Sequence, residues 1–298
     1  MFDVTVLGSI AVDHIIYIDE IPAWDETRIV NAYMVEAGGS AANVAYILAR
    51  LGFKAAFHGK VGGDYWGRFS LNSLSNAGVD ISGAVVDEKL RTAQAFILVN
   101  KDGMKIIFVS AGEGFALSPE LKDVKYYLID DSRAVYIGEV FLEVAEAVAK
   151  YAKKIGRKVV YRVLTPYARM GYSKLKRVFP YVDLLVLNSR SWEFLKASGA
   201  QIKNILDLGL EYVIVTLGDR GCSIYGEDEV RSISSVKTGK VVDTTGCGDA
   251  FTAGLIAKLL KGWTITEAAR YGAKIASWAA SEIGARKGID KFISENNL

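Results

Sequence analysis

The chain has 298 residues but only two cysteines and two histidines. Cys222 and Cys247 do not have the spacing of metal ligands, and no secretory signal is recognisable. Neither His14 nor His58 has a partner at a spacing typical of catalysis. We therefore expect a cytoplasmic protein whose chemistry does not depend on a cysteine–histidine metal site.

Long apolar runs and an excess of one charge are also missing. No apolar segment approaches the roughly 20 residues that cross a bilayer. The 36 basic and 34 acidic residues are mixed along the chain and give a formal net charge of +2. This balance lacks the basic footprint that nucleic acids or acidic membranes attract, so we expect neither as a partner.

What is present is a regular alternation of short β-branched runs and amphipathic segments, in a chain that is 51% hydrophobic. Such alternation is typical of an α/β fold with a mainly parallel sheet covered by helices. We predict one domain over residues 1–298. The expected strands are Val4–Leu7, Ala55–Val61, Ala134–Ile137, Lys158–Tyr161, Leu184–Leu187 and Tyr212–Leu217. The expected helices are Ser40–Leu51, Glu139–Ile155, Trp192–Ala197, Ala250–Lys261 and Ile265–Ile283.

Two stretches interrupt this alternation. Residues 14–36 alternate as strands, and residues 93–110 read as a hairpin around Lys101-Asp102-Gly103. The hairpin arms are apolar on both faces and need a cover. We interpret both stretches as a small sheet that forms a lid over the active cleft, with a second subunit covering it in a homodimer. The alternative is that they extend the main sheet.

The segment Asp243–Gly254 carries the strongest chemical signal. Gly246 and Gly248 permit a turn in which successive amides converge, and the following helix adds the positive end of its dipole. This arrangement predicts an anion site. Asp249 stands at its mouth, where it can remove a proton from a hydroxyl that attacks a bound phosphate. A purely structural acid at a helix start is the alternative.

A second glycine-rich turn precedes the predicted helix at Ser40. Gly38 and Gly39 allow a ligand to approach the backbone closely, and Asn43 lies about 200° around the helix from the apolar stripe, so it can face the cleft. Asp13 follows the first strand, where an open α/β sheet presents its ligand crevice. A carboxylate there suits sugar hydroxyls, although capping of a turn is an open alternative.

Together these residues resemble the ribokinase, or PfkB, family of carbohydrate kinases. Two signatures about 200 residues apart carry the resemblance. The first is matched by Gly38, Gly39, Ala41, Asn43, Ala45, Gly52 and Gly62. The second is matched by Asp243, Thr244, Gly246, Gly248, Asp249, Ala253, Gly254 and Leu255, with Cys247 where the family has a smaller residue. The resemblance implies a ribokinase-like three-layer sandwich with a small β-sheet lid.

The family also implies roles for individual residues. By resemblance Asp249 is the general base, and Gly246, Cys247 and Gly248 form the anion hole. Sugar-binding positions are matched by Asp13, Gly38, Gly39, Asn43 and Glu139. ATP is the implied phosphate donor, with Thr216, Gly218 and Gly221 in its binding turn. Asn188 begins a motif associated with Mg²⁺ and the donor phosphates, and Asp243 and Thr245 match a loop that holds K⁺ in some members.

Four departures from the family pattern qualify these roles. Ser191 stands at the glutamate position of the Asn188 motif, which leaves the handling of Mg²⁺ open. Ser40 replaces a lysine common in ribokinases, and Ala11 replaces an asparagine, so the substrate need not be ribose. Arg162 lies in a strand-end segment that lacks the pattern of ketodeoxygluconate kinases. We expect Arg162 to be a surface or structural residue rather than a contact to an anionic substrate.

The function that the sequence favours is transfer of the γ-phosphoryl group of ATP to a hydroxyl of a small sugar. A nucleoside kinase of adenosine-like specificity is the nearest alternative, with Phe96, Phe108 or Tyr17 lining a slot for the base. A non-catalytic sugar- or nucleotide-binding protein is a third. A dinucleotide-binding oxidoreductase is disfavoured because no Gly-x-Gly-x-x-Gly follows the first strand.

Overall fold

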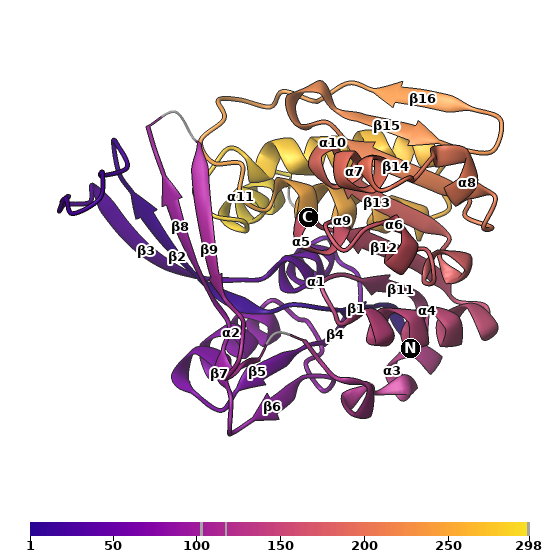
Figure 1. The fold of residues 1–298 in the computed structure, drawn as a ribbon, viewed down its shortest axis with the longest axis horizontal. Helices are drawn as coiled ribbons and strands as arrows, with labels where there is room; N and C mark the ends of the chain where they lie inside the picture. The colour runs from indigo at the N-terminus through magenta and orange to yellow at the C-terminus, as the bar shows by residue number, and fades with distance from the viewer. Residues whose placement is uncertain (102–103, 117, 297–298) are drawn as a thin grey trace.

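The computed structural model describes residues 1–101, 104–116 and 118–296. Its largest feature is an eight-stranded sheet in the order β16-β15-β14-β13-β12-β11-β1-β4 (Figure 1). The six strands from β14 to β4 are parallel, and β15 and β16 close one edge as antiparallel strands. The strands are β1 (Phe2–Leu7), β4 (Ala55–His58), β11 (Ser132–Ile137), β12 (Lys158–Val163), β13 (Leu184–Asn188), β14 (Tyr212–Thr216), β15 (Cys222–Tyr225) and β16 (Val230–Ile233).

Helices cover both faces of this sheet. Alternate residues of a strand point to opposite sides, and in the central strands both sets of side chains are apolar. In β13, Leu184 and Val186 pack into one core, and Leu185 and Leu187 pack into the other. The first core lies under α1 (Ser40–Arg50), α2 (Tyr65–Asn76), α9 (Cys247–Leu259), α10 (Ile265–Ala279) and α11 (Lys287–Glu295). The second lies under α3 (Tyr126–Asp130), α4 (Leu142–Lys154), α5 (Thr165–Ala168), α6 (Tyr172–Leu175), α7 (Ser189–Ala197) and α8 (Ile202–Leu206). The three-layer prediction is confirmed.

A separate four-stranded sheet has the order β3-β2-β8-β9. Its strands are β2 (Ala11–Tyr17), β3 (Ala32–Gly38), β8 (Gln94–Val99) and β9 (Lys105–Ser110). In Figure 1 they stand at the left, clear of the main sheet. They therefore do not extend that sheet, and the small separate sheet expected from residues 14–36 and 93–110 is present. We call it the lid. Asp102 and Gly103 of the predicted turn lie outside the described residues.

Several predicted boundaries shift. The single strand expected over Ala55–Val61 is interrupted at Gly59, and its second half, β5 (Lys60–Gly62), pairs with β6 (Val85–Asp87) in a small sheet of its own. Another such pair joins β7 (Arg91–Thr92) to β10 (Phe115–Ala116). The helix expected from Ala250 begins at Cys247, which brings Asp249 into its first turn. Among the described residues, no helix is both long and apolar enough to cross a membrane.

Candidate active site

The turn before α9 has the geometry of an anion site. Gly246 is the N-cap of the helix and adopts the left-handed conformation, with φ 74°. A Cβ on Gly246 would lie 2.4 Å from the Cβ of Ala285, so the position needs glycine on both counts. The first amides of a helix have no acceptor within it. The amide of Cys247 donates a long hydrogen bond of 3.4 Å to the carbonyl of Thr244.

Asp249 lies in the first turn of α9, directly after these residues, and is 6% exposed. Its two carboxylate oxygens are held from different elements of the fold. Ser40 Oγ donates to Oδ1 over 2.9 Å, and Asn43 Nδ2 donates to Oδ2 over 2.9 Å. Arg162, at the end of β12, forms an ion pair with Oδ1. The carboxylate is therefore fixed beside Gly248 at the anion site.

Of the surface or structural position expected for Arg162, the structure excludes the surface one. Its side chain is only 10% exposed, and Nη1 also donates to Ser40 Oγ over 2.7 Å. Burial disfavours the charged form, but Asp249, Tyr136 and Glu139 together outweigh it and raise the pKa of Arg162, so the guanidinium stays charged. The burial of Arg162 and its ion pair with Asp249 were not apparent from the sequence, because the two residues are 87 positions apart.

Asp13 lies on β2, and its carboxylate covers Gly38 at the end of the neighbouring strand β3. A Cβ on Gly38 would come within 2.2 Å of Asp13 Oδ2, which explains the glycine. Burial raises the pKa of Asp13 to about 7, opposed by the charge of Arg286. Gly39 has a φ of 91° and permits the turn from β3 into α1. Asp13, Gly38 and Gly39 are thus brought together.

Glu139 follows β11 and is 8% exposed. Its Oε2 accepts a hydrogen bond of 2.7 Å from Ser9 Oγ, whereas Oε1 is buried with no partner among the described residues. Burial raises the pKa of Glu139, and the charge of Arg162 opposes this. A buried acceptor without a donor is costly, so Oε1 suits a ligand hydroxyl.

Both ends of the Asn43 amide are engaged within the protein. Nδ2 donates to Asp249, and Oδ1 accepts from Arg286 Nε over 2.9 Å. Arg286 also donates from Nη1 to Ser73 Oγ over 2.9 Å and is 8% exposed. Sequence reasoning missed Arg286, which has no motif around it. Asn43 therefore orients Asp249, whatever contact it also makes with a substrate.

A cavity of about 570 Å³ opens beside the anion site. Cys247 and Gly248 are among its lining residues, and burial raises the pKa of the Cys247 thiol to about 12, so Cys247 contributes no thiolate to this lining. The predicted donor-binding residues Thr216, Gly218 and Gly221 line the same cavity. Its remaining walls are Asp219, Ser235, Val236, Lys237, Gly239, Val241, Thr244, Phe251, Ala273, Ala276, Ser277 and Ala280.

The loop before α9 is tied to the segment before α11. Asp243 is buried, and its Oδ1 accepts from the amide and hydroxyl of Thr245 over 2.8 and 2.7 Å. Its Oδ2 accepts from the Gly284 amide over 3.0 Å. Lys105 Nζ, on lid strand β9, donates to Thr245 Oγ1 over 3.2 Å. The lid thus touches the anion-site loop, a contact that the sequence did not reveal.

The Asn188 side chain is engaged at the start of a helix. It is the N-cap of α7, and its Oδ1 accepts from the amide of Ser191 over 2.7 Å. Ser191, at the position where the family has glutamate, is completely buried. Within residues 1–101, 104–116 and 118–296, no group of three or more His, Cys, Asp or Glu side chains could hold a metal ion.

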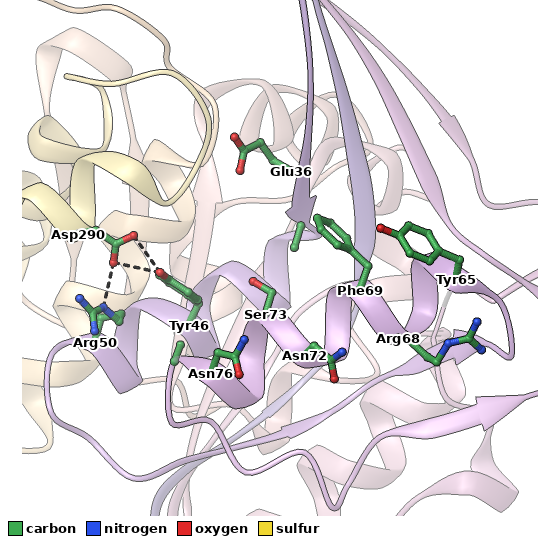
Figure 2. A pocket seen from close by; sticks show the side chains of 12 residues that line it. Glu36, Tyr46, Arg50, Tyr65, Arg68, Phe69, Asn72, Ser73, Asn76 and Asp290 are labelled. Carbon is green, nitrogen blue, oxygen red and sulfur yellow. Dashed lines mark hydrogen bonds and ion pairs between the residues drawn. The ribbon is translucent and has the colours of Figure 1, made fainter.

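Another cavity, of about 730 Å³, lies elsewhere, along α1 and α2 (Figure 2). At one end Tyr46 and Arg50 bond to Asp290, with Oη to Oδ2 at 2.9 Å and Nε to Oδ1 at 2.9 Å. At the other end are Tyr65 and Arg68. Its lining residues include neither Asp249 nor Gly248, so it is separate from the candidate active site.

Comparison with known proteins agrees with this geometry. Residues 1–291 match the profile of the pfkB family of carbohydrate kinases. A ribokinase of Haemophilus influenzae is 30% identical over 96% of this chain and 94% of its own length. The crystal structure of a Methanocaldococcus jannaschii nucleoside kinase aligns with a TM-score of 0.82 at 24% identity, over 100% of this chain and 98% of that one. An Arabidopsis thaliana ribokinase complexed with ribose and ATP aligns with the same TM-score and identity, over 98% of both chains. At these identities the two structures support the fold alone.

Proposed function

Because this chain belongs to the pfkB family of carbohydrate kinases, we propose that it transfers the γ-phosphoryl group of ATP to a hydroxyl of a small sugar. One observation carries the proposal. Asp249 is a buried carboxylate held in a fixed orientation beside Gly248, and Gly248 lines a cavity large enough for a nucleotide. A base and an anion site are thereby adjacent.

In the proposed reaction Asp249 accepts the proton of the acceptor hydroxyl as its oxygen attacks the γ-phosphorus. The new O–P bond forms while the bond from phosphorus to the bridging oxygen of ADP breaks. The amides of Gly246, Cys247 and Gly248 stabilise the negative charge on the transferring group. The lid reduces the access of water, whose attack would hydrolyse ATP.

For the acceptor we propose a site between the lid and the main sheet. Asp13 and Glu139 supply carboxylate oxygens for sugar hydroxyls, and Gly38 and Gly39 let the ligand approach the backbone. Asn43 completes this site and orients Asp249. The support is that Glu139 Oε1 has no donor among the described residues, although it is buried.

For the donor we propose that ATP occupies the cavity of about 570 Å³. Thr216, Gly218 and Gly221 form one wall, and apolar residues of α10 and the 236–241 segment provide a surface for the adenine ring. The γ-phosphate would then point toward Gly248. Lys237 lines this cavity but does not belong to a phosphate-binding Gly-Lys-Ser/Thr loop, so backbone amides would carry the phosphate contacts.

Mg²⁺ and K⁺ enter the proposal only through the family. The Asn188 motif supplies no magnesium ligand set among the described residues, because Asn188 caps α7 and Ser191 has no carboxylate. Mg²⁺ would therefore be held mainly by the phosphates of ATP and by water. Both oxygens of Asp243 already accept hydrogen bonds from the loop, and Asp243 and Thr245 as a K⁺ site stay a prediction.

The distribution of side chains between the two faces of the lid sheet favours a sugar over a nucleoside as the acceptor. Asp13 and Tyr17 share one face of β2, because they are four residues apart. Phe96 stacks on His14, with ring centroids 4.8 Å apart, and Phe108 pairs with Phe96 across the strands. Both phenylalanines therefore lie on the face opposite Asp13. Of the three aromatic residues suggested for a base slot, only Tyr17 faces the acceptor side.

The direct test is a coupled assay of ADP release with ribose, fructose, adenosine and inosine as acceptors. We expect acceptor-dependent ADP formation that is fastest with a sugar, and a phosphorylated product detected by ³¹P NMR. Faster turnover of a nucleoside would favour the alternative specificity. If none of these acceptors stimulates ADP formation or gains a phosphate, the proposed acceptor specificity is wrong.

We also propose a homodimer formed through the lid. β9 is an edge strand whose residues Ile106, Ile107, Phe108 and Val109 are exposed on both faces of the sheet. An apolar edge of this kind favours association with a second copy. Analytical ultracentrifugation should show a dimer, and Phe108→Lys should shift it to monomer. A monomeric wild-type protein at micromolar concentration would contradict the proposal.

A further inference from the structure

Neither a general base at Asp249 nor an anion hole of backbone amides requires a cation at the position of Arg162. A Cβ on Gly248 would lie 2.4 Å from Arg162 Nη2, so the guanidinium rests against the backbone of the anion-site turn. Nη1 contacts Asp249 and Ser40 at the same time. One charged group is therefore shared between the carboxylate and the surface on which a phosphate would lie.

The charges around Arg162 suggest why a cation is needed at this position. Asp13, Glu139, Asp243 and Asp249 are all at least nine-tenths buried in this region, and they oppose the approach of a polyphosphate. The cations that face them are Arg162, Arg286 and Lys105. Arg286 donates to Asn43 and Ser73 but keeps Nη2 buried with no partner among the described residues, and Lys105 donates to Thr245. Arg162 is the cation in van der Waals range of Gly248, the residue that bridges the donor cavity and Asp249.

We propose that Arg162 is a catalytic residue whose guanidinium contacts the phosphoryl group during its transfer, while remaining bonded to Asp249. This inference rests on the proposed function. The planar guanidinium presents five N–H donors, which is enough to serve a carboxylate and a phosphoryl oxygen together. Charge spreads over the equatorial oxygens of the phosphoryl group as it moves, and a fixed cation at that point stabilises it.

The assignment also accounts for Ser40. A hydroxyl at this position accepts from Arg162 Nη1 and donates to Asp249 Oδ1, so it joins the two charged groups without adding a charge. A longer cationic side chain at residue 40 would compete with Arg162 for the same carboxylate. The cation that serves the phosphoryl group therefore comes from β12 and not from the glycine-rich turn.

The experiment must separate a contact to phosphate from a purely positioning role toward Asp249. We would compare Arg162→Met, Arg162→Lys, Asp249→Asn and the double variant Asp249→Asn/Arg162→Met. Arg133→Met, at the opposite end of the neighbouring strand β11, is the matched control. The double variant carries neither buried charge, so it avoids an unpaired ion. Thermal unfolding confirms that each variant is folded.

We expect Arg162→Met to lower kcat by ~10²–10³-fold, the effect of removing one donor from an oxyanion hole, and Arg162→Lys to restore part of it. In the double variant, residual turnover should fall at least about tenfold below that of Asp249→Asn alone. Equal turnover in Asp249→Asn and the double variant would mean that Arg162 acts only through Asp249, and would overturn the proposal.

A second readout needs no acceptor. ADP with aluminium fluoride mimics a phosphoryl group in flight, and calorimetry measures its binding against ADP alone. In the Asp249→Asn background, Arg162→Met should weaken binding of the fluoride complex at least tenfold and leave ADP binding unchanged. Unchanged binding of both would overturn the proposal. If wild-type protein shows no acceptor-dependent ADP formation, the proposed function fails; if it is active and Arg162→Met retains its kcat, only this inference fails.

Discussion

The side-chain amide of Asn43 donates a hydrogen bond of 2.9 Å to Asp249, although 206 residues separate the two in sequence. The same amide accepts a hydrogen bond of 2.9 Å from Arg286. Arg286 can only donate and the carboxylate can only accept, so the amide has a single orientation that satisfies both. The line Arg286–Asn43–Asp249 therefore fixes the proposed base from the side opposite Arg162.

The first prediction concerns Asp249 itself. Asp249→Asn should lower kcat by ~10²–10⁴-fold, the usual contribution of a general base. The amide nearly preserves the shape of the carboxylate, so binding of ATP measured by calorimetry should change little. Steady-state assays with the preferred acceptor provide the measurement. Retention of most of the activity would show that Asp249 is not the base.

The second prediction is a pH dependence set by Asp13. Burial raises its pKa to about 7, so the ionised form that accepts sugar hydroxyls predominates only above that pH. We expect kcat/KM for the acceptor to fall as the pH decreases below about 7. In Asp13→Asn, kcat/KM should be low at every pH and should lose this limb of the profile.

The same carboxyl group should also make the free energy of unfolding depend on pH, in the direction opposite to that of kcat/KM. The unfolded state loses the Asp13 proton near pH 3.8, before the folded state does at about 7. Asp13 therefore makes the free energy of unfolding decrease as the pH rises through this window. Urea titrations of wild type and Asp13→Asn should diverge between pH 4 and pH 7, with the variant more stable at the higher pH. Parallel curves would place the pKa near its ordinary value.

The third prediction concerns the contact between the lid and the anion-site loop. Lys105→Met removes the donor to Thr245 and should lower kcat/KM on the order of tenfold, since hydrogen bonds from charged groups contribute about 1.5–3 kcal/mol. A less closed lid should also increase the ATP hydrolysed per molecule of product. Lys203→Met, on exposed α8, is the matched control. The same effect in both variants would argue against a specific role for Lys105.

The fourth prediction tests the packing that supports α9. A Cβ on Gly272 of α10 would lie 2.6 Å from the carbonyl oxygen of Phe251, and backbone cannot move aside cheaply. Gly272→Ala should lower the free energy of unfolding by ~1–3 kcal/mol, as overpacking does. Gly112→Ala meets no atom within 4 Å and should leave stability unchanged or slightly higher. Urea denaturation of both variants makes the comparison.

The parts of the site that the sequence could predict are those encoded locally. Gly246 adopts a left-handed conformation in the turn that its glycine-rich segment predicted, and Asp249 stands in the first turn of the helix. Strands β1, β11, β12, β13 and β14 were expected within two residues of their observed ends. In these cases neighbours in sequence determine the geometry, so a single chain carries the signal.

The parts that escaped prediction depend on contacts between distant elements. Arg162 reads as an ordinary strand residue until β12 is placed beside α9. The roles of Arg286 and Lys105 likewise become visible only in their hydrogen bonds, to Asn43 and Thr245 respectively. Phe96 was suggested for a base slot, and the sequence could not show that strand register pairs it with His14, on the face of the lid opposite Asp13. The short strands β15 and β16 were missed because four residues each give too little periodicity.

Asp13 belongs both to the lid, on β2, and to the proposed acceptor site. In the strand register it stands opposite Glu36 of β3, just before the glycine turn. Any outward tilt of the lid would therefore withdraw a carboxylate from the bound sugar in the same movement. Opening and product departure would be a single event, and a mutation that stiffens the base of the lid would slow turnover even with every reacting group intact.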